Sequence, residues 1–544
     1  MDRSLASVPA TGAAHLPAGA AIGGQVSVGH PSQHPVLAVA AVLLGAFVVS
    51  FDTRLFAMGL PDLRGAFGLT FDEGAWLATI STAPQILIAP AIAWLATVFG
   101  LRRVLVGPSL LYIAVSLVIP FVRHYQVLLV LHFVHGLLLG VFIPATIMIV
   151  LRNLPVQWWI VGLGAYTFRL SFTGNAGVSL VGFYVQHLGW EWLYWQDALV
   201  LALMAVLTWL GTPREGVNRQ LLANADWGGM VLLGAGLALI YVGLDQGNRL
   251  DWFQSGTVTC LIVGGAALVV GFLINEAVVA DPWASPKVLM SRNIILVLMA
   301  LITFMITSLS NTMLVPNFLT IVGQFRPEQV GSVLLIYTAL PLIGVVLAAI
   351  YLLRRIDARI VAILGFTSFA IASWMGTRIT HEWATDDFVP IALAQALGQG
   401  LTFTGLLIFA VSNSNPARAT AFVAYIQVMR LDVVEFTATT MTTWLRVRQQ
   451  VHSNLVGLHV SAGDAEMAQT LGRLIGRLAE HGTAAESALA RATGAVASIV
   501  RREANVLSLI DGFQVTFWAA IAGLLLISLT HAAPNGPLTP EKAR

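Results

Sequence analysis

Residues 36–61 read VLAVAAVLLGAFVVSFDTRLFAMGLP, an apolar run that carries Asp52 and Arg54 toward its far end. A helix needs about 20 mostly apolar residues to cross the hydrocarbon core of a bilayer. An ionisable side chain near the bilayer centre costs roughly 2.5–3.5 kcal/mol, so it normally faces a protein interior or an aqueous cavity. The stretch therefore predicts a membrane-spanning helix whose ionisable side chains face a protein interior or an aqueous cavity, and not a simple membrane anchor.

The composition of the whole chain leads to the same class. Hydrophobic residues make up 57% of the 544 residues and charged residues only 10%, whereas soluble domains carry about 25% charged residues. The net charge of +2, without a compact basic cluster, gives no reason to expect a nucleic-acid partner. The lone Cys260 excludes an intramolecular disulfide and thiolate metal sites. No phosphate-binding loop or nucleophile elbow is present, so we expect neither an enzyme nor a cofactor.

Further apolar runs of spanning length follow the first, separated by polar residues, glycine or proline. Counting the first, they predict fourteen membrane spans, at residues 36–60, 74–99, 104–122, 127–151, 158–185, 193–211, 227–244, 256–277, 294–321, 329–353, 360–378, 389–411, 419–445 and 509–530.

The positive charges of the short connections predict the orientation. Arginine and lysine are concentrated in alternate connections, and such connections usually lie in the cytoplasm. They include Arg102, Arg103, Arg152, Arg214, Arg219, Lys287, Arg292, Arg354, Arg355, Arg359 and Arg418. Both termini are therefore expected in the cytoplasm.

Three segments fall outside the expected spans. Residues 1–35 are rich in Ala, Gly, Pro and Ser and are expected to form a disordered cytoplasmic tail, and residues 531–544 a second tail. Residues 446–508 are polar, with Leu474 and Leu478 among apolar residues at helical spacing. We expect a helical hairpin there, outside the membrane on the side opposite the termini. It is either a lid over the protein's own outer face or a docking surface for another protein.

Eight ionisable residues inside apolar runs are the candidate site. Such side chains usually mark substrate, ion or proton pathways. They are Asp52, Arg54, His132, His135, Arg169, Arg430, Asp432 and Glu435.

Several short segments occur in an order and spacing that are typical of one protein family. They include FDTRLFAMGLP at 51–61, AWLA at 93–96 with GLRR at 100–103, WEWLYWQD at 190–197, DWGG at 226–229 and LDQG at 244–247. The first resembles the pattern LDxTIxNxALP, and the third resembles WRWIFxIN. The set extends over nearly the whole chain from residue 36. It resembles the fourteen-span drug:proton antiporters of the major facilitator superfamily, the EmrB/QacA type.

This resemblance implies an all-α membrane protein with the major facilitator superfamily fold. Two six-helix bundles, residues 36–211 and residues 293–445 with 509–530, would flank two extra central spans within residues 227–277. Such transporters move substrate by rocking their halves around a site at the membrane midplane. The cavity would be lined by spans one, two, four, five, nine, ten, twelve and thirteen. All eight candidate residues lie on spans one, four, five or thirteen.

The chain also departs from the family pattern. The acid and base expected after AWLA are Thr97 and Val98, which leaves Gly100, Arg102 and Arg103 as the remainder of a gating loop. The segment GVSLVG at 177–182 only partly resembles the antiporter motif GPxxGG. His132 occupies the position of the family's fourth-span arginine, whereas the thirteenth-span arginine is kept as Arg430. Asp432 and Glu435 stand where relatives have small glycines.

The acids and histidines are the candidate proton carriers. Asp52 is the first choice, with a structural ion pair to Arg169 or Arg430 as the alternative. Asp432 and Glu435 share a helix face and could share a proton, take a cation, or form an interhelical ion network. His132 and His135 could carry protons or form buried hydrogen bonds; they lack a third ligand for a metal site.

The arginines remain protonated, so they can tune an acid or bind an anionic group but cannot release a proton. Arg54, Arg169 and Arg430, with His135, are the candidates for cavity electrostatics, although Arg54 could instead pair with a neighbouring helix. Two fixed guanidinium groups favour an amphipathic or anionic substrate.

The expected function is proton-coupled efflux of small organic molecules across a bacterial inner membrane. By resemblance, a periplasmic adaptor of the HlyD type and an outer-membrane channel are possible partners. Two alternatives stay open: a proton-coupled importer of an organic anion, and a membrane sensor or scaffold that binds ligand without transport.

Overall fold

The computed structural model describes residues 34–279, 282–285, 288–414, 419–458, 460, 465–480 and 485–532, and every regular element there is helical. The predicted tails at 1–35 and 531–544 lie almost entirely outside the described residues. The first half comprises α1 Pro35–Phe67, α2 Phe71–Phe99, α3 Leu101–Val118, α4 Tyr125–Asn153, α5 Trp159–Phe183, α6 Trp192–Gly211, α7 Arg219–Ala223, α8 Trp227–Gly247 and α9 Gly256–Val278.

The second half contains longer helices that π-helical turns interrupt. Its α-helices are α10 Arg292–Leu309, α11 Val315–Asn317, α12 Pro327–Leu334, α13 Leu340–Leu353, α14 Ala358–Gly376, α15 Val389–Asn413, α16 Ala419–Val428, α17 Val434–Leu458, α18 Ala465–Glu480 and α19 Ala485–Ser528. The π-helical turns are η3 Tyr184–Leu188 in the first half, then η6 Ser310–Leu314, η7 Phe318–Val322, η8 Leu335–Ala339 and η11 Met429–Val433.

Local sequence signals explain where the first helices begin and end. α1 stops at Gly68, whose φ of 66° is in the left-handed region that glycine adopts without strain. Thr70 and Glu73 form a reciprocal capping box at the start of α2. Gly100, with φ 85°, turns the chain between α2 and α3. These turns place α1, α2 and α3 as successive helices joined by very short connections.

Twelve helices among the described residues are long and apolar enough to cross a membrane. Each of the fourteen predicted runs coincides with a helix or with helices joined through a π-helical turn. The two that are not among the twelve are α5 and the continuous α16–η11–α17. Both carry buried polar side chains, Arg169 and Asn175 on α5 and Arg430 on η11, which lower their hydropathy.

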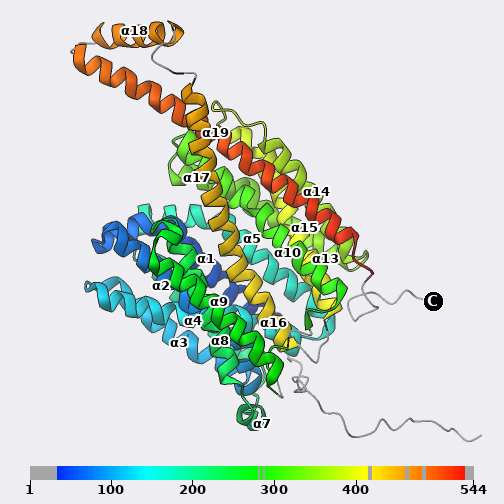
Figure 1. Cartoon of the computed structure of the whole chain (residues 1–544). Coiled ribbons are helices and arrows are strands. Elements are labelled where there is room, and N and C mark those ends of the chain that lie inside the picture. Colours follow the sequence, from blue (N-terminus) through cyan, green and yellow to red (C-terminus); the bar gives the residue numbers. More distant parts are fainter. Residues whose placement is uncertain are drawn as a thin grey trace, which may run out of the picture.

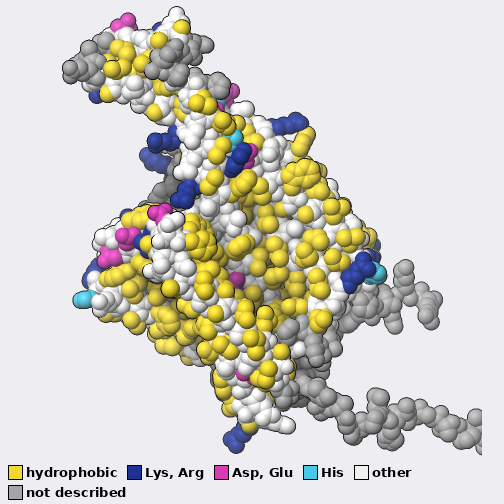
Figure 2. Space-filling model, viewed as in Figure 1, with side chains coloured by type: hydrophobic (Ala, Val, Ile, Leu, Met, Phe, Trp, Pro, Cys, Tyr) yellow, Lys and Arg dark blue, Asp and Glu magenta, His cyan; other side chains and the backbone are white. Residues whose placement is uncertain are grey.

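The helices form two packed groups with a helix pair beside them (Figure 1). In the first group α1 packs on α5 and α6, α2 on α4, and α3 on α6. In the second group α14 packs on α15 and α19, and α19 also packs on α10 and α17. The groups meet where α5 contacts α12, α13 and α15, and where α2 contacts α16. Hydrophobic side chains cover most of the visible helical body (Figure 2).

The pair α8 and α9 packs tightly against the first group. A Cβ atom on Gly234 of α8 would lie 2.1 Å from the carbonyl oxygen of Leu87 on α2. Real Cβ atoms do not approach an oxygen this closely, so the absent side chain lets the two helix backbones touch. The pair is therefore part of the packed body.

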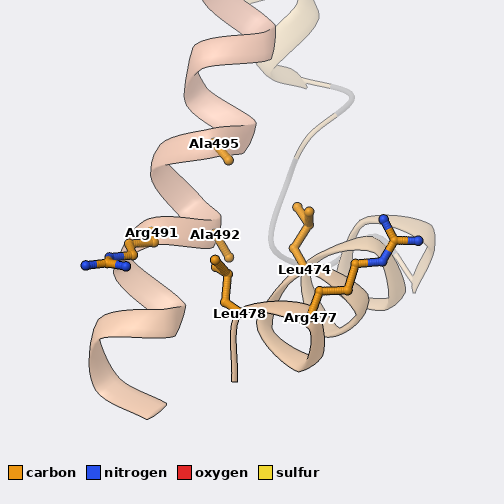
Figure 3. Close-up of a pocket in the computed structure, with 6 residues that line it drawn as sticks. All are labelled: Leu474, Arg477, Leu478, Arg491, Ala492 and Ala495. Carbon is orange, nitrogen blue, oxygen red and sulfur yellow. The ribbon is translucent and has the colours of Figure 1, made fainter. Parts of the chain in front are cut away.

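The predicted polar hairpin at 446–508 consists of the ends of α17 and α19 with α18 between them. α18 projects at the opposite end of the molecule from α7 (Figure 1). Leu474 and Leu478 of α18 point toward Ala492 and Ala495 of α19, around a pocket of about 330 Å³ (Figure 3). α19 has 44 residues, which at 1.5 Å per residue makes a helix about 66 Å long.

The carboxylate of Asp511 connects α17 and α19 below the projecting segment. Asp511 of α19 accepts hydrogen bonds from Arg448 Nε at 2.5 Å and from His452 Nε2 at 2.7 Å, both on α17. The projecting segment is thus anchored to the second helix group at its root.

Candidate functional site

A group of buried polar side chains lies inside the first helix group, contributed by α1, α3, α4 and α6. Polar groups buried among apolar helices need partners, and partly satisfied ones often mark a functional site. The members, called here the N-bundle cluster, are Asp52, Tyr112, Ser116, His132, His135, Tyr194, Gln196 and Asp197.

The two histidines of α4 are held by hydrogen bonds within this cluster. His132 Nδ1 donates to the Leu128 carbonyl at 2.8 Å, and its Nε2 lies 3.0 Å from Tyr194 Oη. Because a carbonyl only accepts, the neutral ring carries its proton on Nδ1 and accepts from Tyr194. His135 Nε2 lies 3.2 Å from Ser116 Oγ, and its ring stacks on Tyr112. Both histidines therefore contact the interior of the first helix group, facing α3 and α6.

Two carboxyl groups share this interior. Asp52 is only 3% exposed and Asp197 is fully buried. Their helices α1 and α6 pack together. The ring of Phe51, next to Asp52, meets the ring of Tyr184, whose hydroxyl donates to Gln196, next to Asp197. Asp197 accepts hydrogen bonds from Gln196 Nε2 at 2.5 Å and from Tyr112 Oη at 3.4 Å. Asp52 Oδ1 has no hydrogen-bond partner among the described residues. No described cation forms an ion pair with either carboxyl group, so the structural pair of Asp52 with Arg169 or Arg430 is not observed.

Arg169 and Arg430 are buried arginines, one from each helix group. Arg169 of α5 donates to Ser50 Oγ, and its guanidinium carbon lies 4.8 Å from the centre of the Tyr166 ring. Arg430 of η11 donates from Nε to Gln427 Oε1 at 3.1 Å. Each guanidinium group brings a positive charge into the protein interior, and the two are called here the arginine pair.

Aromatic side chains lie beside the arginine pair. Tyr166 packs near Phe403 of α15, with ring centres 6.3 Å apart, and Phe403 stacks on Phe304 of α10 at 5.1 Å. Positive charge next to aromatic surface is a combination that suits an amphipathic anion.

A chain of amides connects the helix groups nearby. Asn175 of α5 donates to Gln399 of α15 at 2.9 Å and accepts from Asn311 of η6 at 2.5 Å. Asn311 also lies 3.4 Å from Thr338 Oγ1 on η8. Three π-helical turns, η6, η8 and η11, therefore place polar residues near the contact between the groups. Such π-helical turns occur frequently at functional sites.

Asp432 and Glu435 lie on η11 and α17, and α17 packs against the extra helix α8, which carries a third acid, Asp245. Thr443 of α17 donates to Asn248 at the end of α8 at 3.1 Å. Glu435 Oε1 accepts from Thr439 at 3.1 Å. In the described part of the chain, no three His, Cys, Asp or Glu side chains are placed to hold a metal ion, so no metal site accompanies these acids.

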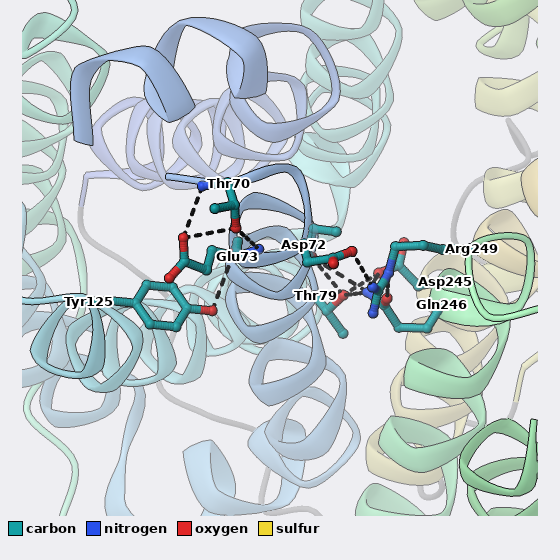
Figure 4. A network of polar contacts seen from close by, with 9 residues as sticks. Thr70, Asp72, Glu73, Thr79, Tyr125, Asp245, Gln246 and Arg249 are labelled. Carbon is teal, nitrogen blue, oxygen red and sulfur yellow. Dashed lines mark hydrogen bonds and ion pairs between the residues drawn. The ribbon is translucent and has the colours of Figure 1, made fainter. Parts of the chain in front are cut away.

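Asp245 also belongs to a polar network between α2 and α8 (Figure 4). It accepts from Thr79 Oγ1, and Gln246 Nε2 donates to the same Thr79 oxygen at 2.5 Å. Arg249 donates to Gln246 Oε1 at 2.6 Å and to Asp72 at 2.6 Å. The network fastens α8 to α2 and places its acid beside the second helix group.

The predicted gating loop is held by residues that the sequence reasoning did not single out. Arg152 of α4 forms an ion pair with Glu215 at 3.3 Å and donates to the Ala96 carbonyl. Glu215 also lies against Gly100. Arg102 instead stacks over Trp209, 4.2 Å from the ring centre, and Arg103 is exposed. The ion pair of this region is thus between Arg152 and Glu215, and neither Arg102 nor Arg103 takes part in it.

One predicted site residue is not described, and two further acids belong to the site. Arg54 lies on α1, but its side chain is outside the described side chains. The sequence reasoning missed Asp197 and Asp245 as site residues, and only Asp197 carried the signal of the eight candidates. Asp197 is an acid inside the predicted span at 193–211, and Asp245 comes directly after the predicted span at 227–244.

Comparisons with known proteins agree with this architecture. The family model described as Major Facilitator Superfamily matches residues 42–430. The chain therefore belongs to the major facilitator superfamily: it is a multi-pass membrane transporter, and not an enzyme.

Two relatives are distant resistance proteins. The chain is 24% identical over 424 residues to the probable multidrug resistance protein EmrY of Escherichia coli K12, covering 76% of this chain and 81% of EmrY. It is 19% identical over 438 residues to the fatty acid resistance protein FarB of Neisseria gonorrhoeae, covering 79% of this chain and 85% of FarB. The predicted resemblance to the fourteen-span drug:proton antiporter family is confirmed.

A solved structure supports the fold alone. The proton:xylose symporter XylE, bound to 6-bromo-6-deoxy-D-glucose, superposes with a TM-score of 0.51 at 12% identity, covering 76% of this chain and 90% of XylE.

Proposed function

We propose that this chain is a proton-coupled exporter of small amphipathic or anionic organic molecules in a bacterial inner membrane. It crosses the membrane fourteen times, with both termini in the cytoplasm. Residues 36–211 form one bundle, residues 293–445 with 509–530 form the other, and the two extra spans lie within residues 227–277. The similarity to EmrY and FarB supports the direction of transport.

The proposal of proton coupling rests on the burial of the Asp52 carboxyl group. A charged carboxylate in such a place is costly unless it is paired, and no described cation pairs with it. Asp52 Oδ1 also lacks a hydrogen-bond partner among the described residues. A carboxyl group in this position changes its protonation when water access changes, which is what alternating access to the two membrane sides provides.

The arginine pair supports the substrate class. Each helix group contributes one buried guanidinium group, and an anion bound between the groups would accept hydrogen bonds from both. The neighbouring rings of Tyr166, Phe403 and Phe304 offer apolar contact for the rest of such a molecule. FarB, described as a fatty acid resistance protein, is a relative of matching chemistry.

Transport by purified protein in vesicles tests the proposal. Anilinonaphthalene sulfonate is a fluorescent anionic probe with a fixed charge, and tetraphenylphosphonium is a matched lipophilic cation. With an imposed pH gradient, the sulfonate should move opposite to the protons. Asp52→Asn should abolish this driven flux but keep counterflow, the exchange of probe for probe without a gradient.

A control variant and the other outcomes make this test decisive. Glu276→Gln alters a buried acid of α9, distant in sequence from both bundles' candidates, and should leave driven flux unchanged. Probe that moves in the same direction as the protons would indicate an importer. Binding without proton flux would indicate a sensor or scaffold. Driven flux that survives Asp52→Asn would refute Asp52 as the coupling group.

The projecting α18 and the first part of α19 are the proposed docking surface for a periplasmic adaptor of the HlyD type, which would continue to an outer-membrane channel. Arg477 of α18 and Arg491 of α19 line the pocket between these two helices (Figure 3).

A further inference from the structure

Asp197 is a carboxylate that the proposed function does not yet use. It is fully buried on α6, inside an otherwise apolar helix. The family pattern WRWIFxIN ends in asparagine at this position, and here WEWLYWQD ends in Asp197. Asparagine has nearly the same shape, but it cannot bind a proton, and its NH2 group cannot accept the second of the two hydrogen bonds that Asp197 accepts. The exchange therefore adds an ionisable group of nearly the same size.

The described surroundings of Asp197 are polar, whereas the side chain of Arg54 on α1 is not described. The titratable groups that face it come from every packed element of the cluster. They are Asp52 on α1, Tyr112 on α3, His132 and His135 on α4, Tyr194 on α6 and Tyr184 on η3. Among the described side chains, no arginine or lysine forms an ion pair with Asp197 or Asp52.

A second negative charge beside the first is costly in a buried place, so the pair favours at least one bound proton. The hydrogen bonds indicate where the remaining negative charge is favoured. Asp197 accepts from Gln196 and Tyr112, which stabilises a carboxylate there. Asp52 Oδ1 accepts from no described donor. In the singly protonated pair these bonds favour the charge on Asp197, and the proton can move between the two carboxyl groups.

A hydrogen-bonded chain connects Asp197 to the end of the helix group. Tyr184 of η3, which is partly exposed, donates from Oη to Gln196 Oε1 at 3.3 Å. Gln196 then donates from Nε2 to Asp197 Oδ1 at 2.5 Å. This series of polar groups runs from the solvent-accessible end of α5 and η3 to the buried pair, and it reaches Asp197 before Asp52.

We propose that Asp197 is a second proton-binding residue of this transporter, and that Asp52 and Asp197 act as one coupled pair. The inference rests on the proposed proton coupling at Asp52. The pair alternates between one and two bound protons. The proton that is gained and lost passes through both carboxyl groups, so neither Asp52 nor Asp197 can be replaced by a side chain that binds no proton.

Infrared titration of the purified protein tests the pair without any substrate. Protonated carboxyl groups absorb separately from carboxylates, so the spectra of wild type, Asp52→Asn, Asp197→Asn and the double variant can be compared across pH. Each single variant should change more than one carboxyl signal. The two single differences should not add up to the double difference, because interacting sites titrate as a pair. Glu276→Gln should remove one carboxyl signal from the spectra and leave the signals of Asp52 and Asp197 unchanged.

Transport gives the second readout, with anilinonaphthalene sulfonate as the probe. In Asp197→Asn, gradient-driven flux should fall roughly 10-fold or more, in the range typical for lost proton-transfer groups. Its pH profile should lose one of two titration steps. Counterflow should persist, which a misfolded variant would not allow.

Two results would refute the proposed Asp52–Asp197 pair, and they distinguish a failure of the pair from a failure of the proposed proton coupling. Wild-type driven flux and pH profile in Asp197→Asn, together with additive infrared differences, would refute the role of Asp197 and leave Asp52 as the coupling group. Driven flux that survives in both Asp52→Asn and Asp197→Asn would refute the proposed coupling site itself. If Asp197→Asn loses counterflow as well, the infrared comparison alone decides.

Discussion

Replacing Gly136 of α4 by alanine should destabilise the first helix group by a predictable amount. A Cβ atom at this position would lie 2.2 Å from the carbonyl oxygen of Ser81 on α2, about 0.8 Å inside the 3.0 Å that Cβ atoms respect. The obstacle is backbone and cannot rotate away, so α2 and α4 must separate by about that distance. Overpacking of this kind costs about 1–3 kcal/mol.

Gly107 of α3 provides the matched control. It is exposed, and a Cβ atom there would meet nothing within 4 Å. Alanine at Gly107 should keep or raise the stability by up to about 1 kcal/mol, the helix-propensity gain of alanine over glycine. Thermal unfolding of both variants in the same detergent measures the difference. If Gly136→Ala unfolds at the same temperature as Gly107→Ala or higher, the close approach of α2 and α4 is wrong.

Three further predictions address other parts of the molecule. Arg430→Gln should weaken driven flux of anilinonaphthalene sulfonate about 10-fold and spare tetraphenylphosphonium, while Arg430→Lys should retain part of the anion flux; equal loss of both probes would contradict anion recognition. Asp245→Asn and Thr79→Val should each lower the unfolding temperature, with a coupling of about 0.5–1.5 kcal/mol in the double variant, and additive effects would contradict their hydrogen bond. Deleting residues 459–484, which keeps the Asp511 anchor, should abolish whole-cell efflux and spare vesicle transport; equal loss in both assays would favour the lid interpretation.

The helices could be predicted from the sequence because membrane spans are a property of composition. A run of about 20 apolar residues must become a helix in lipid, wherever its neighbours lie. The residues that ended or interrupted the runs, such as Gly68 and Gly100, also act locally. The span count was less certain, because α5 and α16–η11–α17 carry polar residues that reduce the signal on which counting depends.

The partners of the polar residues could not be predicted in the same way. Which side chains meet depends on the rotation of each helix about its axis and on which helices lie next to it. Neither can be read from the sequence of a single apolar run. Asp52 therefore lies in the interior that α1 shares with α6 and Asp197, and it forms no ion pair with a described arginine. His135 contacts Ser116 and Tyr112 of α3. Asp197 was missed because its segment was assigned to the family pattern WRWIFxIN, although an acid within an apolar run was the signal used elsewhere.

The uninterrupted course of α19 has a mechanical consequence. About 20 of its 44 residues suffice to cross the bilayer, so about 36 Å of the same rigid rod stands outside it. The described helix contains no proline and no π-helical turn that could act as a joint. Any tilt of the second helix group during transport must therefore swing the α18 tip through a larger arc than the group itself. A fluorescent pair attached to α7 and α18 would follow each transport cycle as an amplified displacement, readable on single molecules.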